Sequence, residues 1–187
     1  MSLTRRLLTP LLLLAAALPL SARTEDAPAA SLVVGDAFAK AKNEKKVAMV
    51  AFHASWCGWC HKMDAVMKRP EIKPIFDKYF VVTWLTVLEG PDKKNLENPG
   101  GEDLMKANGG EGQGIPYFYF ANPSSQKTIV TSKRPATATD KGGNVGCPAE
   151  PFEIAYFLDM VKKAVPKITP DEIKTLEAGF KTVKGGG

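Results

Sequence analysis

A pair of cysteines that directly follows an apolar segment constrains the fold of this chain more than any other sequence feature. The segment 47–52 is apolar at every position, a pattern typical of a strand that is covered on both faces of a sheet. Beyond it, Cys57 precedes a stretch in which Cys60, Met63 and Met67 share one helical face. The sequence therefore predicts a buried strand, a short turn and a helix that begins near Cys57.

The position of Cys57 favours its reactive form. At a helix N-terminus, unpaired backbone N–H groups and the helix dipole stabilise an anion such as a thiolate. This predicts Cys57 as a nucleophile. Cys60, one helical turn further on, is placed to attack a mixed disulfide on Cys57, which is the elementary step of thiol–disulfide exchange.

The chain has too few cysteines for a domain that depends on disulfides. It contains 3 cysteines, whereas small secreted domains of that class usually contain four, six or eight. We therefore expect a hydrophobic core to stabilise the fold. Cys147 is left over from the pair.

The N-terminus has the three regions of a secretory signal peptide: Arg5 and Arg6, an apolar stretch over 7–20, and Ser21-Ala22. We predict a signal peptide at 1–22, a flexible segment at 23–32 and one domain at 33–187. The protein is then exported, to the periplasm or the extracellular space. Removal of 1–22 lowers the formal net charge from +5 to +3, which is weak for a nucleic-acid-binding protein.

The remaining elements are predicted from periodicity and from turn residues. Helices are expected where apolar residues recur at helical spacing, from Val34 onward, over 71–79, over 102–108, over 154–161 and after a capping box at Thr169. Strands are expected at 80–87, 115–120 and near 127–131, and loops at 88–101 and 133–148. The pattern predicts an α/β domain with a C-terminal helix.

The segment 47–63, VAMVAFHASWCGWCHKM, resembles the active-site segment of the thioredoxin superfamily, and most of all the exported thioredoxin-like proteins with W-C-G-W-C. The segment Gly114-Ile115-Pro116 resembles the cis-proline loop of that superfamily, and the resemblance covers about residues 33–165. It implies a thioredoxin-like fold, a central mixed β-sheet flanked by helices, with an N-terminal extension and an extra C-terminal helix. It also implies that a cis peptide bond precedes Pro116, which lies against the cysteines, and that the backbone there pairs with an extended substrate.

Two positions depart from thioredoxin. The position of its buried aspartate is Ala51, and the residue between the cysteines that is proline in thioredoxin is Trp59. Proton transfer and redox potential therefore cannot be carried over from thioredoxin. We hypothesise that His61 modulates a thiolate, with an exposed polar role as the alternative.

Aromatic and apolar residues near the two motifs are candidates for contact with a polypeptide substrate. We predict that Trp56, Trp59, Ile115 and Pro116 contact an unfolded or flexible polypeptide, whereas Tyr117 is expected in the core. For Cys147 the resemblance implies a position near the cysteine pair. It is either a third thiol that forms a mixed or regulatory disulfide, or a small apolar residue in a loop.

Together these features predict a thiol–disulfide oxidoreductase of the cell envelope that exchanges disulfides with exported proteins, as a reductase rather than an oxidase. No cofactor or metal is expected beyond the Cys57–Cys60 disulfide, and a monomer is expected. A reductase in that compartment needs a membrane electron donor.

Two other functions fit the same residues. The run from Cys57 to His61 has the spacing of a c-type haem attachment motif, with His61 as one axial ligand. The candidates for the other axial ligand are Met63, Met67, Met105 and Met160. The second alternative is a metal-binding protein, in which His53, Cys57, Cys60 and His61 are the candidate ligands of a soft metal such as Cu(I) or zinc.

Overall fold

The computed structural model describes residues 26–183. The predicted signal peptide lies outside this range, as does the end of the chain beyond residue 183. Within the described range, no helix combines the length and the apolar character needed to cross a membrane.

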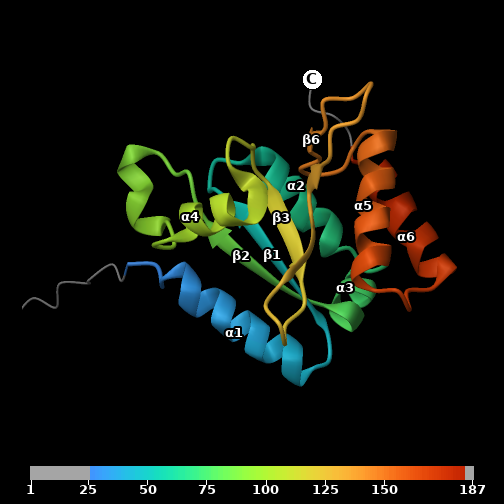
Figure 1. Cartoon of the computed structure of the whole chain (residues 1–187), viewed down its shortest axis with the longest axis horizontal. Helices are drawn as coiled ribbons and strands as arrows, with labels where there is room; N and C mark the ends of the chain where they lie inside the picture. The colour runs from blue at the N-terminus through green and yellow to red at the C-terminus, as the bar shows by residue number, and fades with distance from the viewer. Residues whose placement is uncertain (1–25, 184–187) are drawn as a thin grey trace, which may run out of the picture.

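A mixed four-stranded sheet forms the centre of the domain (Figure 1). Its strands are β1 (Val47–His53), β2 (Phe80–Thr86), β3 (Tyr117–Ala121) and β4 (Thr128–Thr131), in the order β2-β1-β3-β4. Strand β1 pairs in parallel with β2 and antiparallel with β3, and β3 pairs antiparallel with β4. Because β1 lies inside the sheet and is covered on both faces, its interior residues are all buried, as the apolar segment predicts.

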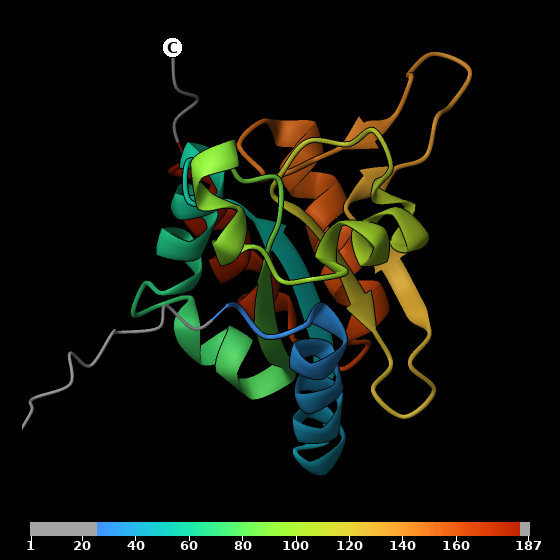
Figure 2. The same ribbon diagram turned by 90° about the vertical axis from the view of Figure 1, so that its left-hand side faces the viewer.

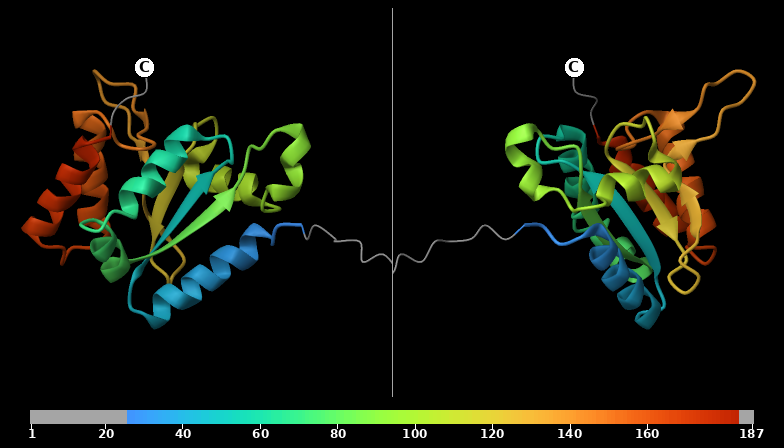
Figure 3. Two further views of the ribbon diagram at one scale, coloured as in Figure 1. Left: turned by 180° about the vertical axis from the view of Figure 1, so that it is seen from behind. Right: turned by 60° about the vertical axis from the view of Figure 1, so that its left-hand side comes forward.

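Helices cover both faces of the sheet, and Figure 3 shows them from two further directions. One face packs against α1 (Ala30–Asn43) and α4 (Gly101–Met105). The other packs against α2 (Gly58–Met67), α3 (Lys73–Tyr79), α5 (Pro151–Ala164) and α6 (Pro170–Lys181). Alternate residues of β3 contribute to the two cores, because side chains along a strand point to opposite faces.

The C-terminal helix is formed as its local signals predict. Thr169 is the N-cap of α6, and its hydroxyl accepts the backbone N–H of Glu172 while the Glu172 carboxylate accepts the N–H of Thr169. Leu176 and Phe180 are fully buried. The extra helix therefore docks on the body of the domain.

The structure differs from the predicted segments in three places. The segment 30–32, expected to be flexible, belongs to α1, because the N–H of Ala30 donates to the carbonyl of Pro99 at 2.9 Å. The loop at 88–101 contains a 3-10 helix, η1 (Pro91–Leu96), and the helix expected at 102–108 is divided into α4 and a π-helical turn, η2 (Lys106–Gly110). The loop at 133–148 contains a hairpin of β5 (Lys133–Arg134) and β6 (Gly143–Asn144), and Figure 2 shows it extending away from the body.

Candidate functional site

The cysteine pair lies where β1 ends and α2 begins. Cys57 is the N-cap of α2, and its Sγ accepts the backbone N–H of Cys60 at 3.1 Å. The two cysteines form a disulfide with an S–S distance of 2.00 Å. Helix α2 therefore directs its N-terminal N–H groups at the sulfur predicted to be the nucleophile, where they stabilise negative charge.

The loop before β3 brings Pro116 against this pair. The peptide bond between Ile115 and Pro116 is cis, which confirms the conformation implied by the resemblance. The Sγ of Cys57 lies 3.6 Å from the carbonyl oxygen of Ile115. Two motifs that are far apart in the sequence thus form one site.

A groove of about 450 Å³ runs beside this site. Its lining comes from the start of α2, the 112–116 loop, the segment after β6 and the start of α5. Trp59, Ile115 and Pro116 line it, together with Asn144, Cys147 and Glu153. A groove of this kind, next to a disulfide, can receive an extended polypeptide.

The two tryptophans beside the pair differ in their contacts. Trp56 is 60% exposed, and its indole N–H donates to the carbonyl of Leu88 at 2.8 Å. Trp59 is 38% exposed, and the Lys62 ammonium lies 4.3 Å from the centroid of its ring. Both rings are accessible to a substrate, although each also has a partner in the protein. Tyr117, by contrast, is fully buried, as expected.

Glu89 is a site residue that the sequence motifs did not reveal. It is 4% exposed, and its carboxylate accepts the backbone N–H of Ser55 at 2.5 Å and the hydroxyl of Ser55 at 2.8 Å. Glu89 thereby fixes the turn between β1 and Cys57. Nothing in its sequence neighbourhood, a loop rich in charged residues, indicates burial.

Asn144 in β6 is a second such residue. Its side-chain amide donates to the carbonyls of Gly114 at 2.7 Å and Pro116 at 2.9 Å, and its backbone N–H donates to the side chain of Gln113 at 3.1 Å. Asn144 therefore binds the cis-proline loop from the side of the groove. The only sequence signal is an asparagine in a glycine-rich turn, which is also typical of ordinary loops.

The two histidines have different hydrogen-bond partners near the turn that contains Ser55. His61 Nε2 lies 3.0 Å from the carbonyl oxygen of Ser55. His53 is the last residue of β1, and its Nε2 lies 3.2 Å from the Thr86 hydroxyl. The influence of His61 on a thiolate stays a prediction.

Cys147 has the environment of an apolar core residue. It is 5% exposed, and burial raises the pKa of its thiol to about 12, because a thiolate loses its solvation there. Lys62 opposes this rise, and Glu153 adds to it. Although Cys147 lines the groove, these features favour the interpretation as a small apolar residue.

The alternative functions find little support in this geometry. Within residues 26–183, no group of three or more His, Cys, Asp or Glu side chains is arranged to hold a metal ion. The methionines considered as haem ligands are all buried among other core side chains: Met63, Met67, Met105 and Met160. A methionine ligand would therefore have to leave the core.

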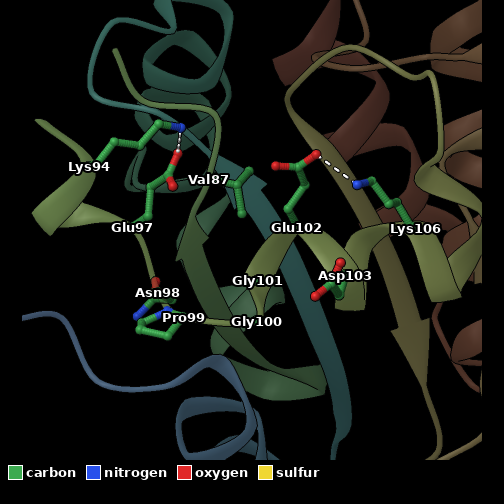
Figure 4. Close-up of a pocket in the computed structure, with 10 residues that line it drawn as sticks. All are labelled: Val87, Lys94, Glu97, Asn98, Pro99, Gly100, Gly101, Glu102, Asp103 and Lys106. Carbon is green, nitrogen blue, oxygen red and sulfur yellow. Dashed lines mark hydrogen bonds and ion pairs between the residues drawn. The ribbon is translucent and has the colours of Figure 1, made fainter. Parts of the chain in front are cut away.

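Another cavity, of about 340 Å³, lies at η1 and α4 (Figure 4). Two of its carboxylates are already paired, Glu97 with Lys94 at 2.8 Å and Glu102 with Lys106 at 2.9 Å. It contains no cysteine or histidine. This cavity therefore offers no group for thiol–disulfide chemistry.

Comparisons with known proteins agree with this geometry. Residues 33–123 match a family model described as thioredoxin-like, a range that contains both cysteines and Pro116. No curated protein matches the chain.

Several solved structures are similar to the chain. A disulphide isomerase from Xylella fastidiosa Temecula1 is 22% identical, over 89% of this chain and 96% of that chain, with a TM-score of 0.48. A thioredoxin from Thermus thermophilus is 25% identical, over 51% of this chain and 68% of that chain, with a TM-score of 0.40. A DsbH oxidoreductase is 18% identical, over 85% of this chain and 96% of that chain, with a TM-score of 0.43.

Proposed function

Since residues 33–123 form a thioredoxin-like domain with a redox-type cysteine pair, as the motifs predict, we propose that the protein is a thiol–disulfide oxidoreductase of the cell envelope. One observation carries the proposal. The Cys57–Cys60 disulfide lies at the N-terminus of α2, with the carbonyl of Ile115 in the cis-proline loop 3.6 Å from the Cys57 sulfur. A nucleophile, a resolving thiol and a backbone segment that can pair with a substrate are thus adjacent.

The reaction follows from the positions of the two thiols. In the reduced protein, the Cys57 thiolate attacks one sulfur of a substrate disulfide and forms a mixed disulfide, and the other substrate sulfur leaves. Cys60 then attacks Cys57, which restores the Cys57–Cys60 disulfide and releases the substrate as a dithiol. The N–H of Cys60, 3.1 Å from the Cys57 sulfur, stabilises negative charge on it before the attack.

We propose exported proteins with disulfides as the substrates. The groove beside Pro116 supports an extended segment, because Trp59 and Ile115 offer apolar surface and Asn144 holds the loop that would pair with it. The exposed ring of Trp56 adds contact area. No cofactor is needed besides the disulfide.

The proposed direction is reduction. The support is the signal-like N-terminus, from which we expect export to a compartment where disulfides form, and the resemblance of its motif to exported thioredoxin-like proteins. Since that compartment supplies no reducing equivalents, a membrane protein would have to donate electrons to Cys57–Cys60.

Trapping the mixed disulfide tests this proposal. We expect wild-type protein to reduce a disulfide-bonded polypeptide such as insulin with a dithiol as electron source. Cys60→Ser should stop at a covalent adduct on Cys57, detected by mass, and Cys57→Ser should be inactive. The absence of an adduct on Cys60→Ser, or full turnover by Cys57→Ser, would contradict the proposal.

A further inference from the structure

A third hollow, distinct from the groove and from the cavity at η1 and α4, lies beside the cysteine pair. The exchange steps described above leave it without a role. Its volume is about 220 Å³, and it is lined by His53, Cys60, His61, Asp64, Lys68 and Trp84. It shares no lining residue with the groove beside Pro116. The resolving cysteine therefore lines a space that contains ionisable side chains and is separate from the substrate groove.

Cys60 needs a partner for its proton. Its side chain is 2% exposed, and a thiol must lose its proton before it can attack a disulfide. Ala51 and His53 lie on the same face of β1, because they are two residues apart in the strand. The side chain of Ala51 has no group that could accept a proton. His53, two residues further along that face, ends the strand at the cavity.

The His53 ring is held in place by two neighbours on β2. Its Nε2 lies 3.2 Å from the Thr86 hydroxyl, and its ring meets the Trp84 ring edge-on with centroids 5.3 Å apart. A hydroxyl both donates and accepts, so this contact persists whether the imidazole is neutral or charged. His53 can therefore change protonation state without a change of position.

Burial is the main influence on the pKa of His53. Burial lowers the pKa of His53 below 6.5, and His61 also lowers it, while Glu89 and Asp64 raise it. Lys68, the remaining charged group of the lining, is paired with Asp64 at 2.6 Å. The lowered pKa favours the neutral ring, which can accept a proton.

We propose that His53 accepts the proton of the Cys60 thiol, through water in this cavity or directly, and returns it when the pair is reduced again. The inference rests on the exchange function proposed above. A cavity of about 220 Å³ with histidine, carboxylate and ammonium groups in its lining has room and hydrogen-bond partners for water between the two groups.

The Cys60 proton passes to the imidazole, and the Cys60 sulfur attacks the Cys57 sulfur of the mixed disulfide. The Cys57–Cys60 bond forms, the bond from Cys57 to the substrate sulfur breaks, and that sulfur leaves as a thiolate with the bonding electron pair. Two electrons have then passed from the cysteine pair to the substrate disulfide.

The two thiols can be followed separately with dithiobis(nitrobenzoate), a disulfide that releases one coloured thiolate per attack. Reduced protein in a Cys147→Ala background is mixed with the reagent at a series of pH values. The first phase reports attack by Cys57, and the second reports resolution by Cys60. His53→Gln is compared with His61→Gln, which alters the only other histidine of the chain.

We expect His53→Gln to slow the second phase about tenfold or more and to remove its inflection in the pH range of a histidine. Its first phase should keep the wild-type rate, and His61→Gln should keep an inflection in the second phase, moved to higher pH because His61 lowers the pKa of His53. A second phase of His53→Gln with wild-type rate and pH profile would overturn the inference, as would an equal slowing of both phases. A first phase that survives in Cys57→Ser would instead overturn the exchange function and this inference with it.

Discussion

At the scale of single residues, the site contrasts two environments for the same side chain. Cys57 receives a backbone N–H at the start of α2, whereas Cys147 is enclosed by apolar groups that raise its pKa to about 12. Because a thiolate is the reactive species, the first environment favours exchange and the second suppresses it. The cysteine count indicated a leftover thiol, but only the structure distinguishes its two interpretations.

We predict that Cys147→Ala leaves both phases of exchange within about twofold of wild type. In the native reduced protein, iodoacetamide should modify Cys57 quickly and Cys147 only after unfolding, because so little Cys147 is thiolate at pH values well below about 12. Peptide mass analysis of the alkylated protein checks this. Rapid native alkylation of Cys147 would instead support the regulatory thiol.

At the scale of elements, predictions from local signals agree with the structure, and those that depend on distant contacts do not. The strand before Cys57 and the cap at Thr169 are encoded within a few residues, and the cis bond before Pro116 is implied by the resemblance of its short motif. The start of α1 depends on a hydrogen bond from Ala30 to Pro99, and the position of Asn144 depends on a hairpin without alternating apolar residues. These contacts join segments far apart in the chain, so periodicity does not contain them.

Asn144→Ala tests the role of β6 in holding the cis-proline loop. Loss of the hydrogen bonds to Gly114 and Pro116 leaves two carbonyls without that partner and loosens the segment proposed to pair with a substrate. We predict a KM for a disulfide-bonded polypeptide that is raised about threefold to tenfold, with little change in the rate of reduction of a small disulfide. Equal effects on both substrates would show that Asn144 does not act through the loop. Asn122→Ala, at the turn before β4, is the matched control.

Glu172 links the cap of α6 to α3. Partial burial acts to raise the pKa of Glu172, but the hydrogen bonds from Lys78, the backbone N–H of Thr169, Tyr79 and the Thr169 hydroxyl outweigh it and lower the pKa to about 2. The ordinary value is 4.5. The folded state therefore binds this proton less readily than the unfolded state, and the stabilisation is lost as the pH falls from 4.5 towards about 2.

We predict that Glu172→Gln lowers the free energy of unfolding by about 1 kcal/mol at pH 7, the usual size of a lost cap. The difference in the free energy of unfolding between this variant and wild type should shrink as the pH falls from 4.5 towards about 2. Urea unfolding at several pH values measures it, with Glu177→Gln as a control on the same helix, since Glu177 makes an exposed pair with Lys181. A difference that does not depend on pH would contradict the assigned charge of Glu172.

At the scale of the whole molecule, three separate segments meet at one end of the sheet to form the site. The turn from β1 to α2 brings the cysteines, the loop before β3 brings Pro116, and the hairpin and α5 close the groove. The sequence predicted the first two segments and their chemistry. It did not reveal how Glu89 and Asn144 hold them together, because each acts on a segment far from its own position.

The most direct test of the central claim is the reduction potential of the Cys57–Cys60 pair. Tryptophan fluorescence, from residues beside the pair, follows the redox state in dithiol and glutathione buffers. We predict one reversible two-electron transition near the thioredoxin value of about −270 mV, as a reductase requires. A value near about −120 mV would contradict the reducing direction. The absence of any reversible transition would contradict thiol–disulfide exchange itself.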